Sequence, residues 1–182
     1  FNNLFPADEP VMQGVKALNN PYIGYFLLQT AFAMGRREWA VEVIKAYWSG
    51  MLQHGARTWW EFYDPSEESP ELSCGDTCMG YGVSPNFFLC TELAGIRPAS
   101  PGYKRVFFSP LLGSVNEMKV RIPTPHGYII VDWRVTEGRE LTANITATYP
   151  VDVIPQLEPA TSETATLNVN ENVNIYALDK HS

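Results

Sequence analysis

Several features that mark common protein classes are scarce or absent in this sequence. Charged residues make up only 18% of the 182 residues, and the net charge of -7 contains no long run of one sign. This composition excludes a disordered tail and a basic polyanion-binding protein, so we expect no nucleic acid partner. No stretch reaches the ~18 consecutive apolar residues that a membrane span needs, so we expect no membrane partner either.

Cysteine is also scarce, with Cys74, Cys78 and Cys90 only. Three irregularly spaced cysteines are too few for a disulfide framework, and no histidine lies near them to complete a zinc site. We interpret them as buried or half-buried thiols and expect no metal, although Cys74 and Cys78 could bridge in an oxidising compartment. The sequence does not decide the compartment, although a periplasmic or secreted setting is slightly favoured over the cytoplasm. A homodimer is possible.

The first half of the sequence has a helical pattern. Asn20-Pro21 is a capping residue followed by proline, and the apolar run from Tyr22 to Met34 ends at Gly35. A second apolar stripe over 36–53 predicts an antiparallel helical hairpin. We expect the first helix to be buried on most sides, which requires neighbouring helices upstream. Because the sequence starts at Phe1 without an initiating Met or a signal peptide, we interpret it as a fragment or a processed chain.

The hairpin is followed by a long irregular segment and then by strands. Residues 54–83 are rich in Gly, Pro, Ser and acids, and a third helix is predicted from Ser84-Pro85 to Leu93. From Tyr103 onward apolar residues recur with a period of two, which predicts about seven short antiparallel strands and a β-sandwich. The expected fold class is therefore α+β, with a helical segment over 1–100 and a β-sandwich over 101–182.

The densest candidate for chemistry is the stretch Gly55-Ala-Arg-Thr-Trp-Trp-Glu-Phe-Tyr-Asp64. Aromatic planes stack on the C–H faces of sugars, and a carboxylate such as Glu61 can bind hydroxyls or activate water. This is the composition of a carbohydrate site. On composition alone, the alternative is that the rings belong to the core and that Glu61 pairs with Arg57.

Four ordered motifs give the sequence a resemblance to a known family. Gly55-Ala-Arg-Thr-Trp-Trp-Glu61 resembles the "Gly-Ala-Thr-Thr-x-Trp-Glu" stretch of the bacterial α-L-rhamnosidases of glycoside hydrolase family 78. Three further stretches continue the resemblance. The first is Asn20-Pro21-Tyr22 with Tyr47-Trp48-Ser-Gly-Met-Leu52, and the second is Gly80-Tyr81-Gly-Val-Ser-Pro85 through Glu92-Leu-Ala-Gly-Ile-Arg-Pro98. The third is Pro101-Gly-Tyr-Lys-Arg-Val-Phe-Phe-Ser-Pro110 with Pro123-Thr-Pro-His-Gly127.

The resemblance implies an (α/α)₆ toroid that releases terminal α-L-rhamnose from rhamnosides with inversion and without a cofactor. Glu61 falls on the family's general base, whereas nothing before it matches the general acid, so the remainder of the catalytic domain is expected upstream and this chain alone is expected to be inactive. The candidate sugar contacts around this base are Trp59, Trp60, Tyr63, Asp76, Tyr81 and Tyr22. Trp39 and Trp48 share the apolar stripe of the second helix, so we expect them in the core instead.

One departure from the family opens an alternative. Many members carry a Ser-His-Cys-His-Gly-Trp type of stretch where this sequence has Asp76-Thr-Cys-Met-Gly-Tyr81, so both histidines are absent. Asp76 either replaces a lost polar contact or is an ordinary loop acid. The rival hypotheses are a carbohydrate-binding homologue without catalysis and a purely structural β-sandwich that braces the toroid, with a lectin role still open. His126, in a proline-flanked turn, is expected to be structural.

Overall fold

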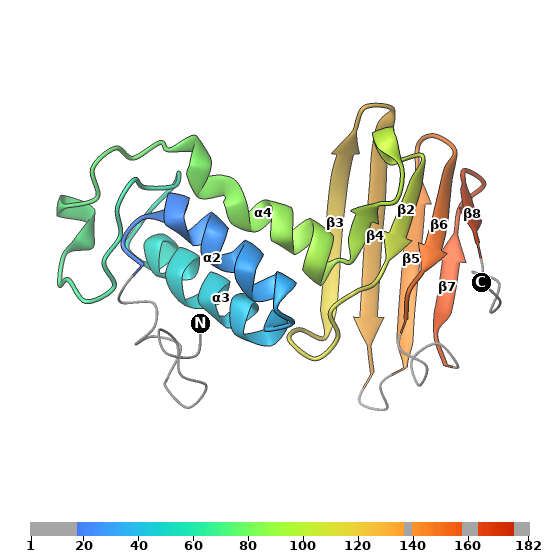
Figure 1. Cartoon of the computed structure of the whole chain (residues 1–182), viewed down its shortest axis with the longest axis horizontal. Helices are drawn as coiled ribbons and strands as arrows, with labels where there is room; N and C mark the ends of the chain where they lie inside the picture. Colours follow the sequence, from blue (N-terminus) through green and yellow to red (C-terminus); the bar gives the residue numbers. More distant parts are fainter. Residues whose placement is uncertain (1–17, 137–139, 158–163, 177–182) are drawn as a thin grey trace. The chain divides into compact units, whose positions relative to one another are not determined.

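The computed structural model describes residues 18–136, 140–157 and 164–176, and shows an α+β protein (Figure 1). The chain divides into two compact units, Phe1–Phe88 and Leu89–Ser182, which we call the first and the second unit and describe separately. The part of the chain described here contains no helix that is both long and apolar enough to cross a membrane.

The first unit is built on a helical hairpin. Helix α2 covers Pro21–Ala33 and helix α3 covers Arg37–Gln53, and the two lie side by side (Figure 1). The Asn20 side chain accepts a hydrogen bond from the Tyr22 backbone N–H at 2.8 Å, which caps α2 and confirms the start predicted from Asn20-Pro21. Gly35 has a φ of 72°, so the chain can turn sharply between the helices.

Short helical turns complete the first unit. The 3₁₀ turns η1 (Pro70–Leu72) and η2 (Gly80–Val83) interrupt the irregular segment that follows α3, and helix α4 covers Ser84–Phe88. The predicted third helix is therefore present, but its second half, η3 (Leu89–Leu93), has π-helical hydrogen bonding and belongs to the second unit.

The core of the first unit lies between α2 and α3. It contains Leu28, Tyr47, Trp48 and Met51, each at most 2% exposed, so the prediction that Trp48 is a core residue is confirmed. Trp39 is half-buried against the same cluster. The expectation that α2 is buried on most sides is wrong for this chain, because the helix packs through one face, on which Gly24, Leu28 and Ala31 are buried and Tyr25 and Phe32 contact the core. Its other face exposes Tyr22, Ile23 and Phe26, each at about half of its surface.

The second unit contains two four-stranded sheets. After η3 and the turn η4 (Pro101–Tyr103), one sheet has the order β1-β2-β6-β8 and the other the order β3-β4-β5-β7. The strands are β1 (Ile96–Pro98), β2 (Arg105–Phe108), β3 (Glu117–Thr124), β4 (Gly127–Val135), β5 (Leu141–Ala147), β6 (Val151–Pro155), β7 (Thr166–Val169) and β8 (Val173–Ile175). Both sheets contribute to one buried cluster that includes Phe108, Val153, Ile129, Trp133 and Ile145.

The strand positions were predicted well, but their direction was not. Strands β2 to β8 fall on the alternating segments, whereas β1 was missed because three residues are too few to show a period. The prediction of purely antiparallel sheets is wrong, since β2 and β6, β5 and β7, and β6 and β8 pair in parallel. The chain changes sheet after β5, so these partners are not joined by hairpins, and a hairpin is what makes sequence neighbours antiparallel.

Gly95 connects η3 to β1 at a point where a side chain has no room. Its φ is 81°, and a Cβ atom there would overlap the Ser109–Pro110 backbone. We predict that Gly95→Ala lowers the free energy of unfolding of the second unit by more than about 2 kcal/mol, because left-handed backbone and steric overlap add. The matched control is Gly113→Ala, where φ is 103° and nothing lies within 4 Å of the added Cβ.

Urea unfolding of both variants measures the difference. The control should lose only about 1 kcal/mol, from backbone strain alone. Equal losses in the two variants would show that the close approach at Gly95 contributes nothing.

Candidate functional site

The site predicted around Glu61 is built from two extended segments of the first unit that lie beside each other. The Glu61 N–H donates to the Asp76 carbonyl at 2.8 Å, the Phe62 N–H to the Cys74 carbonyl at 3.0 Å, and the Met79 N–H to the Trp59 carbonyl at 2.9 Å. These bonds connect residues 59–62 to residues 74–79, so the irregular loop has a defined backbone framework.

The carboxylate of Glu61 lies on the opposite segment of this framework. Its Oε2 atom accepts a hydrogen bond from the Asp76 N–H at 3.3 Å, and a Cβ atom at Gly75 would be 2.7 Å from the same oxygen. Glu61 is half-buried and, among the described residues, forms no ion pair with Arg57 or any other cation. The alternative in which Glu61 pairs with Arg57 is therefore not supported.

The aromatic rings around Glu61 fall into two groups. Trp60 and Tyr63 are each 4% exposed and belong to the core, where Tyr63 contacts Tyr47 edge-on at a ring distance of 5.3 Å. Trp59 is half-buried and lies against the backbone of Gly82, where a Cβ atom would overlap it. Of these three rings, Trp59 has the most surface available to a ligand.

The remaining predicted contacts lie nearer the surface. Tyr22 is half exposed, and its ring contacts that of Tyr81 edge-on at 5.5 Å. Asp76 is exposed and is joined to Glu61 through the backbone. The structure thus brings together Glu61 with Asp76 and Tyr22 with Tyr81, and it places Trp60 and Tyr63 behind them.

The sequence analysis missed the residues that hold this framework. Gly75 and Gly82 let the two segments and the Trp59 ring approach closely. The indole N–H of Trp48 donates to the Gly82 carbonyl at 2.9 Å, and the Thr58 hydroxyl donates to the Thr77 carbonyl. The glycines were visible in the sequence, but their partners are distant in the chain: Glu61 is 14 positions from Gly75, and Trp48 is 34 positions from Gly82.

All three cysteines are free thiols, and two of them, Cys74 and Cys78, belong to this framework. Cys74 is buried and its Sγ donates to the Glu71 carbonyl at 3.2 Å, while Cys78 is exposed, so the bridge left open between them is not formed. Cys90, in the second unit, is half-buried. Within the described ranges, no group of three or more His, Cys, Asp or Glu side chains could hold a metal ion.

Burial changes the titration of two tyrosines behind the framework. Desolvation raises the pKa of Tyr47 far above its ordinary value of 10.0, with smaller contributions from Tyr63 and Asp64. The pKa of Tyr63 is also raised, by burial first and by Asp64 second. Because the neutral form is favoured in the folded state, the resulting stability is complete below pH 10.0 and is lost as the pH rises toward the raised pKa.

We predict that Tyr47→Phe makes the first unit less sensitive to alkaline pH. Above pH ~10, each such tyrosine lowers the free energy of unfolding by about 1.4 kcal/mol per pH unit, and the substitution removes one of them. Urea unfolding between pH 9 and pH ~11.5 measures the slope, with the exposed Tyr128→Phe as control. An unchanged slope in Tyr47→Phe would contradict the prediction.

Comparison with known proteins relates the second unit to a family. Residues 95–170 match the family described as "Bacterial alpha-L-rhamnosidase C-terminal domain". An alpha-L-rhamnosidase of Alteromonas sp. (strain LOR) is 28% identical over 114 residues, which are 59% of this chain and 12% of the relative.

Two solved structures share the fold. The GH78 family rhamnosidase of Bacillus sp. GL1 superposes with a TM-score of 0.63 and 21% identity, over 90% of this chain and 17% of that one. The alpha-L-rhamnosidase from Dictyoglumus thermophilum gives a TM-score of 0.52 and 22% identity, over 63% of this chain and 13% of that one. The chain therefore spans less than a fifth of the length of each of these relatives.

The family match and the relatives agree with the resemblance that the ordered motifs indicate. Residues 95–170 match the family's C-terminal domain, and the chain is similar to a C-terminal portion of the bacterial alpha-L-rhamnosidases.

Proposed function

We propose that the protein to which this chain belongs is an inverting glycoside hydrolase that releases terminal α-L-rhamnose from rhamnosides, with Glu61 as its general base. The observation that carries the proposal is the half-buried Glu61 carboxylate, which is fixed by the Asp76 N–H and free of any ion pair with a described residue. A carboxylate held in this way keeps a fixed orientation, as the abstraction of a proton from water requires.

The hydrogen bond to Asp76 occupies Oε2 and leaves Oε1 without a hydrogen bond to any described residue. An ionised carboxylate can accept several hydrogen bonds, so Oε1 has the capacity to accept one from a water molecule. Inverting glycosidases place a second carboxyl group ~6.5–9.5 Å from the base, so that the water fits between the base and the sugar. That general acid is expected in the upstream part of the catalytic domain.

The aromatic side chains are assigned by their exposure. Trp59, Tyr81 and Tyr22 have accessible surface, so we propose them as direct sugar contacts, together with Asp76. Trp60 and Tyr63 are buried, so we propose that they shape the pocket by supporting the loop from behind. Neither a metal ion nor an organic cofactor takes part in this mechanism.

The architecture extends the proposal. We propose that α2 and α3 are the last hairpin of an (α/α)₆ toroid, that residues 1–100 belong to the catalytic domain, and that residues 101–182 form a β-sandwich. The exposed Ile23 and Phe26 on α2 support this, because a folded domain rarely leaves neighbouring large apolar side chains uncovered. Upstream helices of the toroid would cover them.

A second candidate function is carbohydrate binding without hydrolysis. The observation that favours it is the loop Asp76–Met79, which is mostly exposed and carries no histidine. A pocket without these side chains could bind the sugar and fail to orient the water. Binding of rhamnose by the complete protein without turnover of any rhamnoside would support this candidate.

We predict that Glu61→Gln in the complete enzyme lowers kcat for an aryl α-L-rhamnoside by at least ~100-fold, equivalent to about 3 kcal/mol in the barrier, and leaves rhamnose binding largely unchanged. The amide keeps the size of the side chain but cannot take up the proton. The control is Glu68→Gln on the exposed part of the same loop. Near-normal turnover by Glu61→Gln would refute the assignment.

We also predict that Gly75→Ala impairs turnover without removing the base. The added Cβ would lie 2.7 Å from Glu61 Oε2 and 2.9 Å from Phe62 Cδ2, at a φ of 64°, so the carboxylate must move. A displacement of this size costs ~100-fold in rate in well-positioned sites. Gly35→Ala, at a φ of 72° and with nothing within 4 Å of the added Cβ, is the matched control.

Comparison of kcat and of thermal stability for the two glycine variants separates repositioning from unfolding. A Gly75→Ala enzyme that is folded and fully active would show that the position of Glu61 is not critical.

A further inference from the structure

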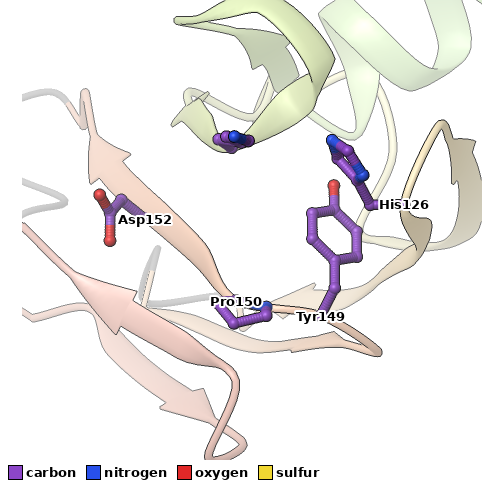
Figure 2. Close-up of a pocket in the computed structure, with 5 residues that line it drawn as sticks. His126, Tyr149, Pro150 and Asp152 are labelled. Carbon is purple, nitrogen blue, oxygen red and sulfur yellow. The ribbon is translucent and has the colours of Figure 1, made fainter.

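The second unit contains a pocket of its own. It has a cavity volume of about 630 Å³ and is lined by Lys104, His126, Tyr149, Pro150 and Asp152 (Figure 2). These residues come from the turn before β2, the β3–β4 hairpin, the β5–β6 connection and the start of β6. Connections that meet on a rigid sheet scaffold are a common location for binding sites.

The backbone on one side of the pocket is held in an unusual conformation. Gly102 and Tyr103 have φ values of 74° and 59°, and Tyr103 is the one described non-glycine residue with positive φ. The Tyr149 hydroxyl donates to the Tyr103 carbonyl at 3.1 Å, and the Arg105 N–H donates to the Ser100 hydroxyl at 3.0 Å. These bonds offset the strain of this conformation, so the backbone position of the adjacent Lys104 is well defined.

The opposite wall is formed by two aromatic side chains whose rings are tilted against each other. The His126 and Tyr149 rings lie 5.5 Å apart at an angle of 56°, and a Cβ atom at Gly102 would be 3.1 Å from His126 Nε2 (Figure 2). His126 is therefore packed between Gly102 and Tyr149, and its imidazole edge remains exposed. Pro150 adds an apolar surface between this wall and Asp152 (Figure 2).

The two charged residues that line the pocket, Asp152 and Lys104, differ in whether a charged partner lies near them. The Asp152 carboxylate lies 3.6 Å from Arg105 Nε and accepts a hydrogen bond from Asn174 Nδ2 at 3.4 Å. Lys104 forms no ion pair with any described residue and is exposed. The negative charge of Asp152 is thus compensated by Arg105, and the ammonium group of Lys104 is left to attract an anion.

We propose that this pocket binds a uronate residue of an acidic oligosaccharide. The sugar carboxylate pairs with Lys104, the hydroxyls bond to His126 and to the Asp152 carboxylate, and the C–H face packs on Pro150. A neutral sugar gains no charge-assisted hydrogen bond from the exposed ammonium, and a small anion such as phosphate leaves the apolar wall unused. The volume of about 630 Å³ falls within the ~300–1,000 Å³ typical of small-molecule sites.

The test uses the whole chain and two trisaccharides, trigalacturonate and neutral galactotriose. Saturation-transfer NMR and calorimetric titration should show that trigalacturonate binds and that galactotriose binds at least about tenfold more weakly, as the loss of one charge-assisted hydrogen bond implies. Lys104→Met should weaken trigalacturonate binding about tenfold or more, and Lys104→Arg should restore it to within about threefold.

The matched control is Lys119→Met, which removes the same charge from β3, where Lys119 pairs with Asp132 at 3.0 Å. It should leave binding unchanged, and thermal unfolding should show that all variants are folded. Three results overturn the proposal: no binding of trigalacturonate, equal binding of galactotriose, or an equal loss in Lys119→Met. Inorganic phosphate at ~10 mM should compete only weakly with trigalacturonate. Full displacement of trigalacturonate by phosphate would show a simple anion site and would also overturn the proposal.

This site shares no residue with the framework around Glu61. Its failure would leave the proposed hydrolysis untouched, and a failure of the proposed hydrolysis would leave this site untouched.

Discussion

The pairing of residues 59–62 with residues 74–79 is the constraint on which the candidate site depends. Three backbone hydrogen bonds connect the segments, and the close approach at Gly75 brings the carboxylate of Glu61 onto the Asp76 N–H. A loop of this length would otherwise have many conformations, and its entropy would oppose any fixed position of the acid. The buried side chains of Trp60 and Tyr63 anchor the loop to the helical hairpin, so local packing and the position of Glu61 are linked.

The first unit shows which structural features local sequence patterns can predict. The cap at Asn20, the turn at Gly35 and the core position of Trp48 follow from residues close together in the chain, and all were predicted. The same patterns predicted that Glu61 lies among aromatic rings, but not which rings are exposed. The exposure of a ring depends on partners far away in the chain, such as Gly82 for Trp59. Neither the period of apolar residues nor a helix cap contains information on such distant partners.

The second unit shows a similar division. Alternating apolar residues predicted seven strands because each strand buries one face, as Ile129, Val131 and Trp133 do on β4. They did not predict the parallel pairs, because strand direction depends on where the chain changes sheet. His126 was expected to be structural, and it does pack against Tyr149, yet the same contact places its ring on the wall of a pocket. Pockets formed by several connections are invisible until the topology is known.

The account is tested most directly by a crystal structure of the complete protein with rhamnose bound. It predicts that the Glu61 carboxylate, still joined to the Asp76 N–H, lies within hydrogen-bond distance of a water molecule beside the anomeric carbon, with a second carboxyl group ~6.5–9.5 Å away on the other side of the sugar. A rhamnose bound elsewhere, or a Glu61 carboxylate facing bulk solvent away from the sugar, would contradict it.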